Sequence, residues 1–261
     1  MRALSIAATG MSAQQRRVEV ISNNLANMNT TGYNARRAEF ADLHYQQAVQ
    51  PGSISSAEGT VIPAGVQLGL GVRTAAVSMD VMQGSLSETG ASLDLAIDGG
   101  GYIEIALPGG EQAYTRDGAL KRNGDGLIVT SDGFQVGAGV TVPEEAIEIA
   151  INADGEVYVY FRDQIEAQLI GQFDIVTFSN DKGLEALGSN LYRETEASGQ
   201  PNVGAPGEDG RGIFRQGYLE DSSVDAVKEL TDLIEAQRGY ELNAKVITAA
   251  DQMLSSTVQI R

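Results

Sequence analysis

The sequence contains no cysteine, and its 261 residues include a single histidine, His44. Without cysteine the chain cannot form disulfides, thiolate zinc sites or a cysteine nucleophile. A nucleophile and base pair is also hard to assemble from one histidine and no Gly-x-Ser-x-Gly turn. We therefore expect a protein that is not an enzyme, with no catalytic residue, no metal site and no cofactor.

Long apolar runs are also missing. No 18 consecutive residues are apolar, so we expect no transmembrane helix and no membrane insertion. The first ten residues are too short and too interrupted for a secretory signal, and they continue into an amphipathic pattern instead of a cleavage site. On composition alone the chain would be placed in the cytoplasm.

Positive charge is scarce in most of the chain. The formal net charge is −17, with +4 on residues 1–37, −2 on residues 224–261 and −19 on the middle. Such an acidic body would repel phosphates, which argues against nucleic acid as a partner. The basic start and the acidic end could attract each other, with Arg16 and Arg17 pairing with Glu235 and Glu241. The sequence leaves open whether such pairs form within one chain or between two.

A helical pattern without proline spans residues 224–258 and is interrupted only by Gly239. Ser222 and Ser223 are expected to cap its start. Its large apolar residues recur at spacings of three and four and form two adjacent rows. One row contains Leu233, Tyr240, Ile247 and Leu254, and the other contains Leu242, Val246 and Met253. The two rows are wider than one partner helix covers, so we expect this helix to be packed on more than one side.

A second amphipathic helix is predicted over residues 4–28. Gly10 weakens it by about 1 kcal/mol relative to alanine. The Asn, Thr and Gly residues at 27–32 favour the turn conformations that end a helix. Amphipathic helices therefore bracket the chain and are expected to meet, because a domain inserted between two segments leaves them as neighbours.

The middle of the chain has the pattern of an antiparallel β domain. Asp-Gly and Asn-Gly pairs, which favour tight turns with positive φ, separate short apolar runs at residues 93–97, 102–107, 127–130, 147–151, 157–161 and 169–178. The expected fold is α+β. Residues 1–35 and 219–261 would form a discontinuous, coiled-coil-like helical domain, and residues 73–218 an inserted β domain. Residues 36–72 would form an extended or hairpin-like connector, with candidate strands at 60–62 and 66–72. The composition of residues 50–72 also fits the alternative of a flexible linker.

Two other site chemistries are weaker. The Asp-Gly pairs lack the spacing of a calcium loop, and they fall where hairpin turns are needed anyway. A pair of carboxylates could serve a cell-wall glycan hydrolase, but 35 acidic residues make some such pair inevitable. A zymogram would separate this alternative from a structural role.

Four stretches resemble one family. Residues 22–33 (SNNLANMNTTGY) and residues 237–247 (QRGYELNAKVI) are similar to the N- and C-terminal signatures of the flagellar rod and hook axial proteins. Residues 95–102 (LAIDGGGY) and 114–118 (YTRDG) resemble the family's body. The paired end motifs occur in the right order, and the resemblance spans nearly the whole chain. Gly239 departs from it, since the family more often has alanine there.

Residues 46–72 resemble the insertion that marks distal rod proteins and that hook proteins lack. The resemblance implies a distal rod subunit, with another rod or hook protein of the family as the alternative. Such a subunit would assemble into a straight, rigid helical tube that crosses the periplasm and transmits torque from the motor to the hook. Its expected partners are copies of itself, the proximal rod proteins, the hook protein, the P- and L-ring bushing and the flagellar type III export apparatus. Export would need no cleaved signal, which replaces the cytoplasmic assignment.

The resemblance also assigns residues to roles. The subunit contacts would come from both ends of the chain, at Asn23, Asn24, Leu25, Asn27, Leu233, Tyr240, Leu242, Val246, Ile247, Met253 and Leu254. The connector would make the tube rigid through Gln50, Pro51, Gly52, Pro63, Gly65, Gly69 and Gly71.

Overall fold

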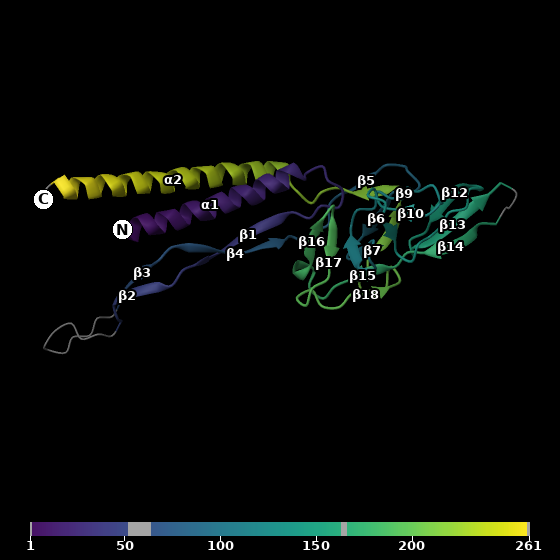
Figure 1. Ribbon diagram of the computed structural model, residues 1–261, viewed down its shortest axis with the longest axis horizontal. Coiled ribbons are helices and arrows are strands. Elements are labelled where there is room, and N and C mark those ends of the chain that lie inside the picture. The colour runs from purple at the N-terminus through teal and green to yellow at the C-terminus, as the bar shows by residue number, and fades with distance from the viewer. Residues whose placement is uncertain (1, 52–63, 163–165, 260–261) are drawn as a thin grey trace. The chain divides into compact units, whose positions relative to one another are not determined.

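The computed structural model describes residues 2–51, 64–162 and 166–259 (Figure 1). The chain divides into two compact units. The helical unit comprises Met1–Leu25, Arg36–Ser78 and Ala226–Arg261, and the β unit comprises Ala26–Ala35 and Met79–Asp225. This division differs from the expected boundaries, because residues 26–35 group with the β strands and residues 36–78 group with the helices.

The two ends of the chain are helical, as predicted. Helix α1 covers Arg2–Ala26 and helix α2 covers Ala226–Gln259. The expected capping of α2 by serine is wrong, since Asp225 stands directly before the helix and the Ser223 hydroxyl accepts the N–H of Ala35 instead. No helix in the described ranges has the length and apolar character needed to cross a membrane.

Residues 36–78, which we call the arm, form antiparallel strand pairs. Strand β1 (Arg36–Asp42) pairs with β4 (Val72–Met79), and β2 (Tyr45–Val49) pairs with β3 (Val66–Gly69). The strand expected at 66–72 is divided between β3 and β4 at Gly71, whose φ of +116° interrupts regular pairing. The candidate strand at 60–62 lies outside the described residues.

In its described residues the β unit holds sixteen further strands, whose bounds are β5 Leu86–Glu88, β6 Leu95–Asp98, β7 Tyr102–Ala106, β8 Gln112–Thr115, β9 Lys121–Arg122, β10 Ile128–Val129, β11 Gln135–Val136, β12 Ala146–Ile151, β13 Glu156–Phe161, β14 Gln168–Gln172, β15 Ile175–Thr177, β16 Glu185–Gly188, β17 Leu191–Arg193, β18 Asn202–Gly204, β19 Ile213–Gln216 and β20 Tyr218–Glu220. A short 3₁₀ turn covers Asp181–Gly183. Each of the six predicted apolar runs overlaps a strand, and the run at 169–178 contributes to two, β14 and β15.

Nine of these strands form one antiparallel sheet. Its main path runs β16-β17-β8-β7-β11-β10-β9. Strand β15 pairs with β7 beside this path, and β18 pairs with β15. A separate sheet has the order β12-β13-β14. The last two strands return to the start of the unit, since β19 pairs with β6 and β20 pairs with β5.

Two apolar clusters form the core of the β unit. The larger is built mainly from aliphatic side chains, with the rings of Phe173 and Phe214 among them, and Ile105, Val157 and Ile175 are fully buried in it. The smaller is aromatic: the rings of Tyr102 and Tyr114 each meet the ring of Phe178 edge-on, at centroid distances of 5.9 and 4.9 Å. This geometry is favourable for aromatic quadrupoles.

The Asp-Gly and Asn-Gly pairs do not all form turns with positive φ. Gly99, Gly126, Gly133 and Gly155 have positive φ, as expected. Gly118 and Gly124 do not, and a Cβ atom on Gly118 would overlap the carbonyl oxygen of Leu95. Glycine is needed there because another strand comes close.

Candidate assembly surface

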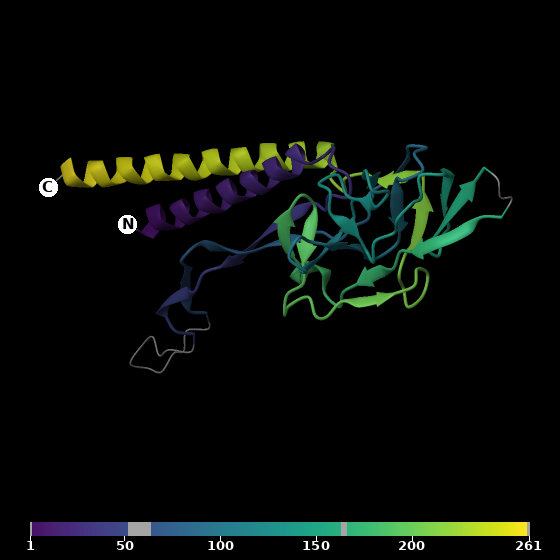
Figure 2. The same cartoon turned by 45° about the vertical axis from the view of Figure 1, so that its right-hand side comes forward.

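Helices α1 and α2 lie side by side and antiparallel, with the N- and C-terminal ends at the same end of the pair (Figures 1 and 2). Three contacts fix their register: Asn24 with Glu229, Gln14 with Gly239, and Gly10 with Asn243. In each contact the two residue numbers add up to 253. The helices therefore meet in one continuous antiparallel register, which we call the seam.

Small residues bring the helices together at the seam. A Cβ atom on Gly10 would lie 2.9 Å from the Oδ1 atom of Asn243, and one on Gly239 would lie 3.1 Å from the Cδ atom of Gln14. Each glycine thus makes room for an amide side chain of the other helix. Gly239, the departure from the family pattern, has a packing role here.

Polar side chains complete the seam. The guanidinium of Arg17 lies 2.6 Å from the Asp232 carboxylate and 3.5 Å from that of Glu235. Arg16 instead pairs with Glu19 on its own helix, at 2.8 Å. Of the pairs left open by the sequence, Arg17–Glu235 therefore forms within one chain.

Asn24 links three elements. Its Nδ2 donates to the Arg36 carbonyl oxygen at 2.8 Å and to the Glu229 carboxylate at 3.2 Å, and its Oδ1 accepts the Arg36 N–H at 2.9 Å. The side chain is buried. Burial also raises the pKa of Glu229, with the Asn24 hydrogen bond acting against this rise. Asn24 thus holds α1 against α2 and against β1 of the arm.

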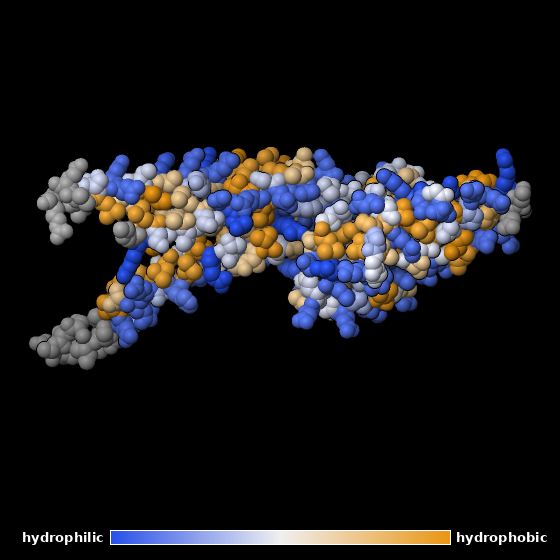
Figure 3. Space-filling view, in the orientation of Figure 1, coloured by the Kyte–Doolittle hydropathy of each residue, from blue (hydrophilic) through white to orange (hydrophobic). Residues whose placement is uncertain are grey.

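Several large apolar side chains of α2 are exposed to solvent. Val227, Leu230 and Ile234 are 75%, 50% and 51% exposed, and we call them the N-terminal stripe. Leu242, Val246 and Met253 are also exposed, and we call them the C-terminal stripe. Because successive residues of an α-helix are rotated by about 100° around its axis, the three side chains of each stripe lie on one narrow side of α2. Leu242 of the C-terminal stripe lies about 80° around the axis from Ile234 of the N-terminal stripe. Apolar atoms reach the surface over the helices in Figure 3.

The structure places the other expected assembly residues differently. Leu25, Leu233 and Ile247 are half-buried, whereas Asn23, Tyr240 and Leu254 are exposed. Asn27 belongs to the β unit, where its side chain accepts a hydrogen bond from the Thr30 hydroxyl. The two predicted rows did not include the N-terminal stripe, although its spacing of three and four residues could have shown it.

The arm carries the expected connector residues. Gln50 and Pro51 follow β2, Gly65 precedes β3, and Gly69 ends β3. At Gly71 a Cβ atom would overlap the side chain of Thr9, whose hydroxyl accepts the Val72 N–H at 3.3 Å. Glycine at 71 therefore lets the arm lie against α1. Gly52 and Pro63 lie outside the described residues.

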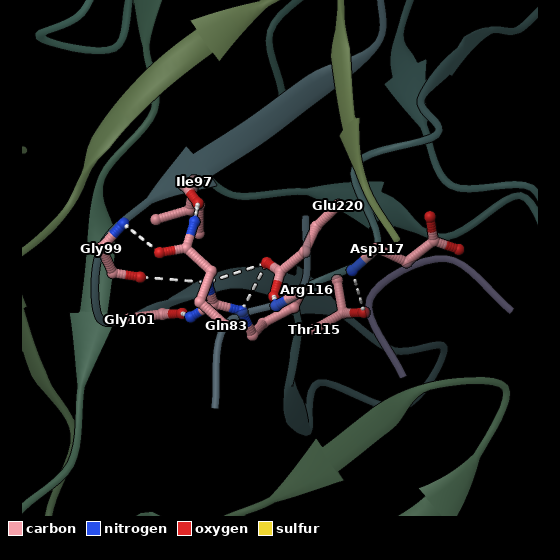
Figure 4. Close-up of polar contacts among 9 residues, drawn as sticks. Gln83, Ile97, Gly99, Gly101, Thr115, Arg116, Asp117 and Glu220 are labelled. Atoms are coloured by element: carbon pink, nitrogen blue, oxygen red, sulfur yellow. Dashed lines mark hydrogen bonds and ion pairs between the residues drawn. The ribbon is translucent and has the colours of Figure 1, made fainter. Parts of the chain in front are cut away.

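In the β unit, Arg116 and Glu220 form a buried ion pair, with side chains 6% and 2% exposed (Figure 4). Both Nε and Nη2 of Arg116 approach Glu220 Oε2 at 2.8 Å. The guanidinium also donates to the carbonyl oxygens of Gly101 and Gly99, at 2.9 and 3.0 Å. This pair therefore connects the two body motifs, residues 95–102 and 114–118, to the last strand, β20.

Two aspartate carboxyl groups near this pair have pKa values above that of free aspartate. Burial raises the pKa of Asp117, although its carboxylate accepts the Ala119 N–H at 3.0 Å. Burial likewise raises the pKa of Asp181, and the charge of Arg116 acts against it. Across the described ranges, no three acidic or histidine side chains gather closely enough to hold a metal ion.

Family models match three parts of the chain. Residues 4–34 match "Flagella basal body rod protein", residues 96–159 match "Flagellar hook protein FlgE/F/G D1 domain", and residues 215–260 match "Flagellar basal body rod FlgEFG protein C-terminal". The flagellar basal-body rod protein FlgG of Caulobacter vibrioides is 52% identical over the full length of both chains. This chain belongs to the FlgG family.

Other FlgG proteins are similar over the same length. The Bacillus subtilis FlgG is 38% identical and covers 100% of this chain and 99% of its own. The B. subtilis flagellar hook-basal body complex protein FlhP is 32% identical, with 100% of both chains covered. The chain is accordingly a structural subunit of the distal rod in the flagellar basal body, and not an enzyme. Both terminal signatures and the body motif at 114–118 lie inside the matched ranges, and the body motif at 95–102 does so except for Leu95.

Proposed function

We propose that this FlgG-family chain builds a straight, rigid helical tube by packing the two stripes of α2 against helices of neighbouring copies. The observation that carries the proposal is the exposure of six large apolar side chains on a helix whose seam with α1 uses small and polar ones. Exposed apolar patches of this kind mark interaction surfaces. Two stripes pointing in different directions favour two neighbours per subunit.

The helix pair would form a coiled-coil-like inner layer, and the arm would reach an adjacent subunit and keep the tube straight. Support for the arm's role comes from its extended strand pairs and from exposed apolar side chains at Tyr45, Val66 and Leu68. The tube would cross the periplasm and carry torque to the hook. Proximal rod proteins, the hook protein and the P- and L-ring bushing are its proposed partners, after export without a cleaved signal by the flagellar export apparatus.

Charge substitutions on the stripes test the proposal. Ile234→Glu and Val246→Glu place a carboxylate on each stripe, and burying it between copies would be strongly unfavourable. Ile147→Glu is the matched control, because Ile147 is 66% exposed but lies on β12 of the β unit. Electron microscopy of the purified chain under assembly conditions should show tubes for the control and none for either stripe variant.

Circular dichroism and near-ultraviolet spectra of the unassembled variants should match those of the unaltered chain, because the substituted side chains are exposed. Straight tubes from both stripe variants would refute the proposed contact. Deleting residues 46–72 should leave assembly intact but give curved or flexible rods, and straight rods would remove the arm from the proposal.

A further inference from the structure

The chain passes between the helical unit and the β unit at four points: 25/26, 35/36, 78/79 and 225/226. Three segments of the β unit adjoin these points, namely residues 26–35, the stretch that starts at Met79, and the stretch that ends at Asp225. Any force carried along the covalent chain between the units must enter the β unit through these segments. How firmly they are held to one another therefore determines how stiff the connection is.

One residue, Glu220, belongs to one of these segments and bonds to the other two. It belongs to the segment that leads to α2. Its backbone carbonyl oxygen accepts the Gly32 N–H at 2.8 Å, which ties it to the segment that follows α1. Its Oε1 accepts the Gly84 N–H at 3.0 Å, which ties it to the segment that follows the arm.

Arg116 anchors Glu220 to the body of the β unit. It follows directly on β8, whose partners β7 and β17 lie in the nine-stranded sheet. Its guanidinium binds Glu220 and the Gly99 and Gly101 carbonyl oxygens together (Figure 4). The backbone of Arg116 also touches the first segment, because a Cβ atom on Gly32 would lie 2.8 Å from its carbonyl carbon.

Further bonds join the three segments directly to one another. The Ser223 N–H donates to the Tyr33 carbonyl oxygen at 3.0 Å, and the Ser223 hydroxyl accepts the Ala35 N–H at 2.9 Å. The Asp80 N–H donates to the Ala35 carbonyl oxygen at 2.8 Å. The Asp221 N–H donates to the Ser85 carbonyl oxygen at 2.8 Å. The segments thus form one cross-linked set around the buried ion pair.

We propose that the Arg116–Glu220 pair keeps these three segments from moving relative to one another under force. The three segments would then transmit torque between the helices and the β unit as one stiff connection. This rests on the proposed torque-carrying function. A buried ion pair is often no more stabilising than an apolar pair of similar volume. The directional side-chain bonds of the pair, however, hold three backbone groups, those of Gly84, Gly99 and Gly101, at fixed positions, which an apolar pair cannot do.

The test therefore replaces the pair without leaving a buried charge. The double variant Arg116→Met with Glu220→Leu fills a similar volume with apolar groups, and it removes the side-chain bonds to Gly84, Gly99 and Gly101. The control is Glu185→Gln, which breaks the exposed Arg193–Glu185 pair, 2.9 Å apart in the same unit. Single variants Glu220→Gln and Arg116→Lys complete the series in case the double variant folds poorly.

Hydrogen exchange of the full-length chain gives the first measurement. We expect the amides of residues 27–35 and 80–86 to exchange at least tenfold faster in the double variant, whereas the amides of β7 remain as protected as in the control. If the ion pair only stabilised the β unit as a whole, the double variant would instead lose amide protection equally at residues 27–35, at residues 80–86 and in β7. Unchanged exchange at 27–35 and 80–86, or an equal change in β7, would overturn the proposal.

Swimming under load gives the second measurement, in cells whose distal rod consists of the variant. Rods counted by electron microscopy should be as numerous as in the control, but swimming speed should fall at least twofold more in viscous medium than in dilute medium. An equal fall in control and variant would overturn the inference while leaving the proposed tube intact. Failure of the unaltered chain to form tubes would instead count against the proposed function. If the double variant makes no rods, its exchange pattern as a monomer decides.

Discussion

The contact between Gly32 and Arg116 allows a sharp test of why the N-terminal signature contains a glycine. Gly32 is buried, its φ is +65°, and its Cβ position lies 2.8 Å from the carbonyl carbon and 2.9 Å from the carbonyl oxygen of Arg116. Gly90 provides the matched control, since its φ is +69° and no atom lies within 4 Å of its Cβ position. Substitution by alanine imposes the same backbone strain at both sites but a collision at only one.

The expected loss in the free energy of unfolding follows from the backbone strain at both sites and the collision at Gly32. A left-handed conformation costs an alanine about 1 kcal/mol relative to glycine, so Gly90→Ala should lower the free energy of unfolding by about that amount. Overpacking against a rigid backbone adds about 1–3 kcal/mol, so Gly32→Ala should lower it by about 2–4 kcal/mol. The gain from a stiffer unfolded chain is similar at both sites and cancels in the comparison.

Urea unfolding of the full-length chain, followed by near-ultraviolet circular dichroism, would measure the difference. The sequence has no tryptophan, so the signal comes mainly from tyrosines, and Tyr102, Tyr114 and Tyr192 lie in the aromatic core of the same unit. Equal destabilisation by the two variants would refute the steric reasoning. A larger effect at Gly90 would also contradict it, because no atom lies near the Cβ position of Gly90.

Two further predictions concern charge and register. Because burial raises the pKa of Asp117 above its usual 3.8, the folded state binds a proton more readily than the unfolded chain, and this carboxyl group lowers stability as the pH rises through that window. Asp117→Asn, which keeps the acceptor oxygen, should therefore raise the urea midpoint at pH 7, with the gain shrinking as the pH falls toward 3.8. Asp125→Asn, at an exposed turn, controls for net charge, and an equal gain in both would contradict the burial argument. The seam predicts that a Gly10→Cys and Asn243→Cys pair oxidises to a disulfide within one chain, since the Cβ position of Gly10 lies 3.1 Å from Asn243 Cγ and both Cβ atoms are thus within reach. Gly10→Cys with Gly239→Cys, one turn out of register, should cross-link much more slowly on a non-reducing gel, and the reverse order would exclude the register.

The sequence predicted the elements better than their partners. Periodicity located both helices, since apolar spacing of three and four residues is a local property. The apolar runs between Asp-Gly pairs located the main strands for the same reason. Very short strands such as β9 and β11 were missed, because two residues carry no pattern.

The seam shows why partners were harder to predict. The hydrophobic rows of α2 were expected to pack on more than one side, but the contacts with α1 use Gly10, Gly239 and two amides, which look unremarkable in a sequence. Ser223 illustrates the same limit, since a good capping residue bonds to a segment 188 positions away. The sequence showed Arg116 only as part of the body motif at 114–118. It could not show the Arg116–Glu220 pair, because the three segments around the pair are far apart in the chain.

The composition of the seam has a thermodynamic consequence. Small and polar side chains bury little apolar surface, so the pairing of α1 and α2 adds little to the stability of a single subunit. The larger gain in stability comes when the stripes of α2 contact other copies. The folding of the helices is then coupled to tube growth, and the stability of the helices depends on subunit concentration. A substitution at the seam, such as Gly239→Ala, would therefore change the critical concentration for growth even though it touches no neighbouring subunit.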